Sequence, residues 1–309
     1  MSVEYTYAAA YVKSLENNML KKEDYTAILN ADGAEEIMRI LRSKGYEGGT
    51  ISDMTENERR KVWDLCFELC GNIPQMKTLM LADDFHNIKA VLKATMSDRE
   101  WESLIYEPTD IDCGQLADAF KKDDFSEIDD RFSQICENAY KIYVKSGDGQ
   151  SVEIYLDRAE LEKMAEESED EFVRGYREIL ALCANLRIYL RSDGKDSDFL
   201  ENALVRCSLI SKQSLVKSRK SKEETLRDEG FKEAYDLYSR SPAEFEKYCD
   251  NMVIEYAKKA EMSFFDFDAV LGYLVGKMTE IKNIRLAAAG NLGREPQEEI
   301  KERLRDSYV

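Results

Sequence analysis

The sequence predicts an all-helical protein in which one helical unit occurs three times. Three observations lead to this fold class. The chain has four prolines in 309 residues, which leaves room for long helices. Apolar residues recur three and four positions apart over long stretches, as on the buried face of a helix. A short polar pattern also recurs at equal spacing, which is typical of an internal repeat.

The repeated pattern is an asparagine, then isoleucine or leucine, then lysine or arginine. It begins at residues 87, 185 and 283, so that each copy starts 98 residues after the previous one. Each copy lies late in a long amphipathic stretch, and a shorter helical stretch precedes it. We therefore expect three helical repeats, at residues 1–105, 106–195 and 196–309.

The polar residues of this pattern are the candidate repeat-defining or partner-contact positions. They are Asn87, Lys89, Asn185, Arg187, Asn283 and Arg285, together with Glu280 three residues before the last asparagine. The position that matches Glu280 is Asp84 in the first copy and Leu182 in the second, so the repeat is approximate.

Two interpretations of these residues are open. In the structural one, the asparagine bonds a backbone group and the basic residue pairs with an acid of a neighbouring helix. In the functional one, the same residues line a face shared by the three units and contact a partner. The structural interpretation is preferred, because buried polar groups need bonding partners.

The middle repeat carries an extra segment. Gly147, Asp148 and Gly149 separate the residues Tyr143–Val144 from Val152–Tyr155. A glycine-rich turn between two short apolar stretches predicts a small β-hairpin on the helical body.

The C-terminal region has the punctuation of a long helix followed by a short one. Ser263 and Asp266 predict a capping box that opens the long helix, and Gly290 predicts its end. Pro296 suits the first turn of a final short helix.

Charge restricts the class of partner. The chain has 62 acidic and 44 basic residues, a formal charge of −18. This field repels phosphate backbones, so nucleic acid is not expected as a partner. One stretch, residues 212–222, holds five cations and no acid, and it is either a solvated surface or a docking patch for an acidic partner.

Targeting signals are not found in the sequence. The first residues lack the basic flank and apolar block of a signal peptide, and no run of 18 apolar residues occurs. We therefore expect neither secretion nor direct membrane insertion. Seven cysteines without a Cys-x-x-Cys pair fit the reducing cytosol.

The sequence offers no catalytic pattern. It has one histidine, His86, and neither a Walker loop nor a nucleophile elbow. His86 is expected to face solvent, because the matching positions hold Ala184 and Lys282. Cys66 and Cys70 would supply only half of a tetrahedral metal site, so they are expected to be buried as small apolar side chains. We expect no catalytic residue, no cofactor and no metal.

Three stretches resemble a known family. Residues 267–290, "FDAVLGYLVGKMTEIKNIRLAAAG", residues 298–309, "EEIKERLRDSYV", and the N-terminal residues 5–29 are similar to the C subunit of V/A-type ATPases, the counterpart of the eukaryotic vacuolar ATPase d subunit. Tyr11 and Met278 depart from the family pattern, which commonly has arginine and glutamate there. A charged pair at those two positions is therefore not expected in this chain.

The resemblance implies both an architecture and a role. The architecture is a funnel of three pseudo-equivalent helical units around an approximate threefold axis. The role is that of a non-catalytic rotor subunit that links the central shaft to the membrane rotor ring and transmits torque for ATP-coupled proton or sodium transport. Its location would be cytoplasmic, peripheral to the membrane through the complex.

The main alternative is a free-standing helical adaptor that binds a partner protein on a concave surface. An enzyme is disfavoured, because its site would have to be built without histidine clusters, metal-ligand spacing or a phosphate loop.

Overall fold

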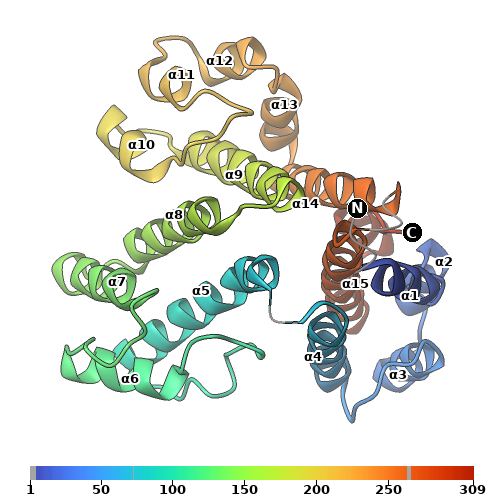
Figure 1. Cartoon of the computed structure of the whole chain (residues 1–309). Coiled ribbons are helices and arrows are strands. Elements are labelled where there is room, and N and C mark those ends of the chain that lie inside the picture. Colours follow the sequence, from blue (N-terminus) through green and yellow to red (C-terminus); the bar gives the residue numbers. More distant parts are fainter. Residues whose placement is uncertain (1–4, 72, 263–265) are drawn as a thin grey trace. The chain divides into compact units, whose positions relative to one another are not determined.

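The computed structural model describes residues 5–71, 73–262 and 266–309. Every regular element in these residues is a helix, which confirms the predicted all-α class (Figure 1). Internal contacts group the chain into two compact units. Unit 1 comprises residues 1–71 and 220–309, and unit 2 comprises residues 72–219. The threefold arrangement and the division into three repeats stay predictions.

Unit 1 combines the two ends of the chain. Its helices are α1 (Thr6–Glu16), α2 (Lys22–Leu29), α3 (Ala34–Ser43), α4 (Ile51–Cys70), α12 (Lys222–Asp228), α13 (Lys232–Arg240), α14 (Pro242–Ala257), the 3₁₀ helix η2 (Lys258–Met262), α15 (Asp268–Leu292) and α16 (Gln297–Arg303).

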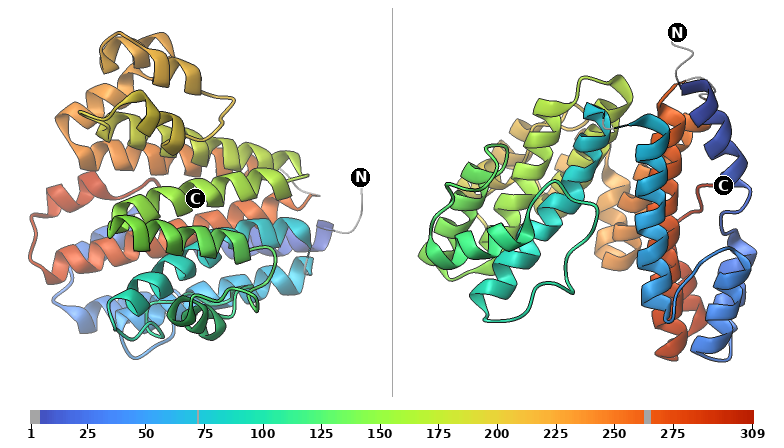
Figure 2. Two further views of the ribbon diagram at one scale, coloured as in Figure 1. Left: turned by 90° about the vertical axis from the view of Figure 1, so that its left-hand side faces the viewer. Right: turned by 60° about the horizontal axis from the view of Figure 1, so that its bottom comes forward.

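Helix α15 forms the centre of unit 1. It packs against α1, α2, α4 and α14, and Figure 2 shows α4 running alongside it. Its buried residues include Ile281, Ile284 and Ala287. A helix that is covered on most sides carries apolar residues around most of its circumference. The core therefore joins elements from the first and last parts of the sequence.

The C-terminal segment packs onto a face of α15 that has no side chains. A Cβ atom at Gly276 would lie 2.5 Å from Cγ of Tyr308, and one at Gly272 would lie 2.5 Å from the Tyr308 hydroxyl. The Tyr308 side chain is buried. Because only glycine permits so close an approach, these two residues fix the position of the C-terminal segment.

The prediction that Gly290 ends the long helix is wrong. Helix α15 continues to Leu292, and Gly293 is its C-cap residue. Gly290 is buried within the helix, where a Cβ atom would lie 2.5 Å from Cδ1 of Ile300. This glycine therefore serves close packing rather than helix termination. The predicted final helix is α16, and Pro296 is its N-cap residue.

Ser263, one half of the predicted capping box, lies outside the described residues. Helix α15 begins at Asp268, two residues after Asp266, and its N-cap residue Phe267 makes no side-chain capping bond.

Unit 2 is the middle of the chain. Its helices are α5 (Pro74–Met96), α6 (Cys113–Lys122), α7 (Ser133–Ser146), α8 (Gly149–Glu167), α9 (Glu171–Arg191), α10 (Ser197–Ala203) and α11 (Lys212–Lys217). Helix α8 packs against α5, α7 and α9, and its position beside α7 is visible in Figure 2. The core includes Phe85 of α5, Phe120 of α6 and Leu156 of α8, all fully buried.

The predicted hairpin in the middle repeat is wrong. Tyr143–Val144 lie in the last turn of helix α7, and Val152–Tyr155 lie in helix α8. Gly147 takes the left-handed conformation, with φ of 64°, and caps the C-terminus of α7. Asp148 accepts hydrogen bonds from the backbone N–H groups of Gln150 and Ser151, which caps the N-terminus of α8. The same turn-forming residues thus join two helices instead of two strands.

Candidate functional site

The three repeated asparagines make the same pair of bonds. Each side chain donates to the carbonyl oxygen of one downstream residue and accepts from the N–H of that same residue. The partner of Asn87 is Tyr106, at 2.9 and 2.7 Å. Asn185 bonds Val205, at 3.0 Å in both directions. We call each such pair an asparagine clamp.

The third clamp joins Asn283 to Arg305, at 3.0 and 2.9 Å. All three asparagines are fully buried. A carboxamide carries a donor and an acceptor in one plane, so it satisfies both backbone groups of its partner at once. Each clamp therefore holds a segment that follows its long helix against that helix.

Two of the three clamped residues occupy the same position relative to a short helix. Short helices α10 and α16 end at Ala203 and Arg303, and the clamped residues Val205 and Arg305 come two positions later. Tyr106 differs, since it lies in the connection between α5 and α6. There the ring of His86, which was expected to face solvent, is only partly exposed and stacks on Tyr106 with 4.2 Å between ring centroids.

Ion pairs with acids on neighbouring helices are formed by Lys89 and Arg285 of the pattern. Lys89 of α5 forms ion pairs with Asp157 and Glu160 of α8. Burial lowers the Lys89 pKa, but these two carboxylates outweigh it and the net pKa is raised. Arg187 of α9 lines a groove of about 470 Å³ together with the same two acids.

Arg285 of α15 donates to Thr55 Oγ1 at 3.0 Å and to Glu56 at 3.1 Å, both on α4. With the clamps, these contacts favour the structural interpretation of the repeated pattern over direct partner contact.

Asp84, one of the two acids that precede the clamps, is fully buried in unit 2. Its Oδ1 atom accepts hydrogen bonds from Thr109 Oγ1 at 2.6 Å and from the Asp110 N–H at 2.8 Å. Burial raises its pKa to about 6, although both hydrogen bonds act in the opposite direction. Asp84 thus fastens the same connection that the Asn87 clamp holds.

Glu280 is the centre of a buried polar cluster in unit 1. Its carboxylate accepts from the Leu20 N–H, the Tyr46 hydroxyl and the Lys277 ammonium, each at 2.5 Å. Lys277 also pairs with Glu58 of α4 at 2.7 Å. We call Tyr46, Glu58, Lys277 and Glu280 the Glu280 cluster. It ties the turn after α1, the turn after α3 and helix α4 to helix α15.

The electrostatics of this cluster follow from burial and charge. Burial raises the pKa of Tyr46 well above its usual range, and the Glu280 carboxylate adds to the effect. Burial would lower the pKa of Lys277, but Glu280 and Glu58 outweigh it and the net pKa is raised. Lys277 therefore stays an ammonium and compensates two carboxylates.

Sequence reasoning found Glu280 but missed its partners. Lys277 stands three residues before Glu280, a spacing that brings side chains together on a helix and could have been noticed. Tyr46 and Glu58 lie more than two hundred residues away in sequence, and nothing local signals them.

The cysteine pair is packed as predicted. Cys66 is fully buried and Cys70 nearly so. Burial raises the pKa of Cys70 to about 12, so its thiol stays neutral. Within the described ranges no three histidine, cysteine, aspartate or glutamate side chains gather as metal ligands would.

The fold and the clamps define an all-helical protein whose recurring polar groups bond its own backbone and brace its helices. Comparison with known proteins shows to which family this all-helical protein belongs. The family model described as ATP synthase (C/AC39) subunit matches residues 8–303, so the chain belongs to this family. The resemblance seen at the two ends of the sequence is thereby confirmed.

Two curated relatives match over nearly their whole length. One is the C subunit of the A-type ATP synthase of Haloquadratum walsbyi, 25% identical and covering 96% of each chain. The other is the C subunit of the V-type sodium ATPase of Enterococcus hirae, 21% identical and covering 99% of each chain. At such identities the likeness extends along the whole chain, while most individual residues differ.

Proposed function

We propose that this chain is the non-catalytic rotor subunit that links the central shaft of a V/A-type ATPase to its membrane ring. It would transmit torque while other subunits turn over ATP and carry protons or sodium ions. The observation that carries this proposal is the match of the C/AC39 family along residues 8–303, with relatives covered over 96% of their length or more.

The internal bonding supports a mechanical role. A part that transmits torque has to resist deformation, and packed helices joined by satisfied polar groups are stiff. The asparagine clamps fasten a connecting segment to each of α5, α9 and α15. The Glu280 cluster further joins α15 to α4. In this proposal the clamps maintain the shape that partners contact, and they are not the contacts themselves.

Association with the membrane would come through the ring. Among the described helices, none combines the length and the apolar character needed to cross a bilayer. The formal charge of −18 favours encounter with a partner surface that is basic, such as cytoplasmic loops rich in lysine and arginine.

Purification from native membranes tests the proposal. A tagged chain should be isolated together with shaft and ring subunits of one rotary ATPase. Membranes from cells without the chain should hydrolyse ATP with little ion transport, and adding the purified chain back should restore coupling.

Two results would overturn the proposal. One is a tagged chain that separates from the ATPase subunits during purification. The other is unchanged coupling in membranes that lack the chain. Either would favour the free-standing adaptor instead.

A further inference from the structure

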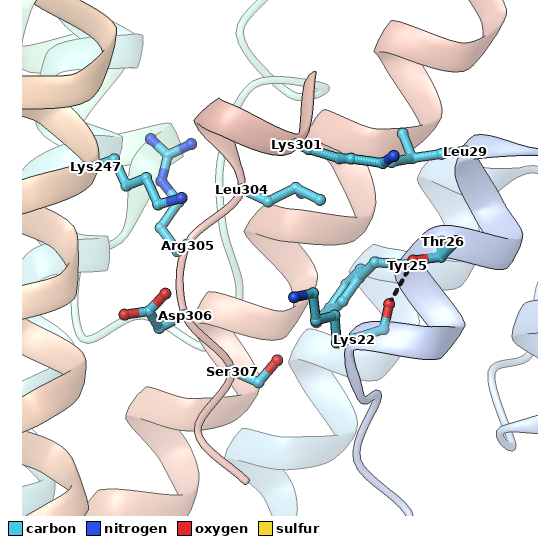
Figure 3. A pocket seen from close by; sticks show the side chains of 10 residues that line it. All are labelled: Lys22, Tyr25, Thr26, Leu29, Lys247, Lys301, Leu304, Arg305, Asp306 and Ser307. Carbon is cyan, nitrogen blue, oxygen red and sulfur yellow. Dashed lines mark hydrogen bonds between the residues drawn. The ribbon is translucent and has the colours of Figure 1, made fainter. Parts of the chain in front are cut away.

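A pocket of about 490 Å³ opens within unit 1 (Figure 3). It lies between helix α2, helix α14 and the segment that follows α16. The partly exposed Leu304 supplies apolar surface, and the buried Tyr25 and Leu29 lie beneath it. This volume is within the range of pockets that bind ligands or side chains of a partner, roughly 300–1,000 Å³.

The rim of this pocket is basic. Lys22, Lys247, Lys301 and Arg305 line it, against one acid, Asp306. Figure 3 shows Lys22 coming from one side and Lys247 from the other, with the C-terminal segment between them. In a chain with a formal charge of −18, such a concentration of cations is an exception.

Two of these cations are already compensated. Lys301 pairs with Glu298 at 2.8 Å, and Arg305 pairs with Asp250 at 2.7 Å. The ammonium groups of Lys22 and Lys247, in contrast, form no ion pair with any residue that the structure describes. The pocket therefore presents two uncompensated positive charges beside apolar surface.

We propose that this pocket, which we call the Lys22–Lys247 pocket, binds an acidic segment of a partner polypeptide. An apolar side chain of that segment would cover the partly exposed Leu304, and flanking carboxylates would meet Lys22 and Lys247. A free phosphate would use the charges and leave the apolar surface exposed, so the polypeptide is the better fit. The inference does not depend on the proposed rotor role.

A photo-crosslinking peptide tests this site on the full chain. The probe is a short peptide in which a benzophenone side chain stands between aspartate and glutamate residues. Its neutral counterpart replaces these acids with asparagine and glutamine. The acidic probe should crosslink to residues of the pocket surface, located by mass spectrometry, and the neutral probe should crosslink much less.

Charge reversal supplies the variant and its control. Lys22→Glu with Lys247→Glu should weaken probe binding by about tenfold, a change of about 1.4 kcal/mol. Arg42→Glu with Lys145→Glu changes the net charge equally at two exposed positions outside the pocket, and it should leave binding nearly unchanged. Circular dichroism of both variants verifies that each is folded.

Three outcomes would overturn the inference. The first is crosslinking spread evenly over the surface. The second is an equal loss of binding in the two charge-reversed variants. The third is competition by inorganic phosphate as strong as competition by the unlabelled acidic peptide, which would indicate a simple anion site.

Discussion

At the scale of single residues, the asparagine clamps act as a substitute for backbone pairing. A carboxamide offers the same donor and acceptor that a neighbouring strand would offer, so a helix can hold an extended segment without any sheet. Because the three asparagines are fully buried, their side chains have given up their own hydration, and the clamp bonds replace it. These bonds should therefore contribute more to stability than hydrogen bonds at the surface.

Removing the third clamp tests this contribution. Asn283→Ala should lower the free energy of unfolding of unit 1 by about 1–3 kcal/mol, because it removes both bonds to the partly buried backbone groups of Arg305. Urea denaturation measures the loss, and hydrogen exchange should be faster at the Arg305 amide. Asn18→Ala, at an exposed position, should change stability by less than about 0.5 kcal/mol. Equal losses in the two variants would contradict the clamp.

The Glu280 cluster predicts a specific coupling between two substitutions. Lys277→Met should destabilise unit 1 by about 3–5 kcal/mol, because Glu280 and Glu58 would be left buried without a compensating cation. Adding Glu280→Gln should restore part of that loss, since one of the two charges disappears. A double-mutant cycle by urea denaturation measures the coupling. Strict additivity of the two substitutions would count against the cluster.

Asp84 predicts a pH dependence. Its pKa is about 6 in the folded chain and 3.8 as the ordinary value, so the folded state holds the proton more tightly. The contribution of Asp84 to stability is therefore greatest below pH 4 and falls by about 3 kcal/mol in all as the pH rises through 6 to about 7. Asp84→Asn should remove this part of the pH dependence.

The exposed Asp130 provides the control for that experiment. Asp130→Asn should keep the wild-type dependence of the unfolding free energy between pH 4 and 6. If Asp84→Asn and the wild type show the same slope, the buried carboxyl has an ordinary pKa.

At the scale of elements, close packing in unit 1 depends on positions without side chains. Gly272 and Gly276 receive the ring of Tyr308, and Gly290 receives Ile300. Glycine has a low helix propensity, so these three residues make α15 less stable as an isolated helix. They also let the C-terminal segment pack closely against it, and this contact offsets the loss. The helix and the segment that follows it are therefore stabilised together.

This balance predicts that the effect of Gly276→Ala on stability changes sign when the Tyr308 side chain is removed. In the wild-type background Gly276→Ala should destabilise unit 1 by about 1–3 kcal/mol, because the new methyl group would collide with the Tyr308 ring. In a Tyr308→Gly background, which also removes the Cβ atom of Tyr308 that would lie 2.8 Å from the new methyl group, the same substitution should be neutral or stabilising by up to about 1 kcal/mol, since alanine is the better helix former. Thermal unfolding of the four proteins measures both effects. A destabilisation of the same size in both backgrounds would contradict the contact.

Elements were predictable from sequence where the signal is local. The helical class and the three asparagine positions follow from periodicity and from spacing. The clamped residues do not, because Tyr106, Val205 and Arg305 contribute only backbone groups, which any residue type supplies. Gly147 was misassigned for a related reason: a turn of glycine and aspartate suits a helix junction as well as a hairpin.

At the scale of the whole molecule, charge is the property that reaches farthest. A formal charge of −18 acts over about one Debye length, roughly 8–10 Å at ordinary ionic strength. It affects encounter with partners more than the fold itself.

Under the proposed function, binding to the membrane ring should weaken with salt. The purified chain should bind ring-containing membranes less tightly at about 0.5 M salt than at about 0.05 M, because exposed charges are screened. Sedimentation of the chain with membranes measures this. Binding that is insensitive to salt would exclude an electrostatic contribution. The proposed role as a link between shaft and ring would then be tested by the purification experiment alone.

The composition of unit 1 also determines when it can form. Leu20, Tyr25 and Ile28 share a core with Ile284 and Ile300, which are synthesised much later. At ordinary rates of synthesis about 10–40 s separate the emergence of α4 from that of α15. During this interval the first four helices lack the surface that covers them, so a prematurely terminated chain would expose apolar residues to chaperones and proteases. Only a chain translated through α16 can complete this core, so the first four helices depend on residues made about 200 positions later.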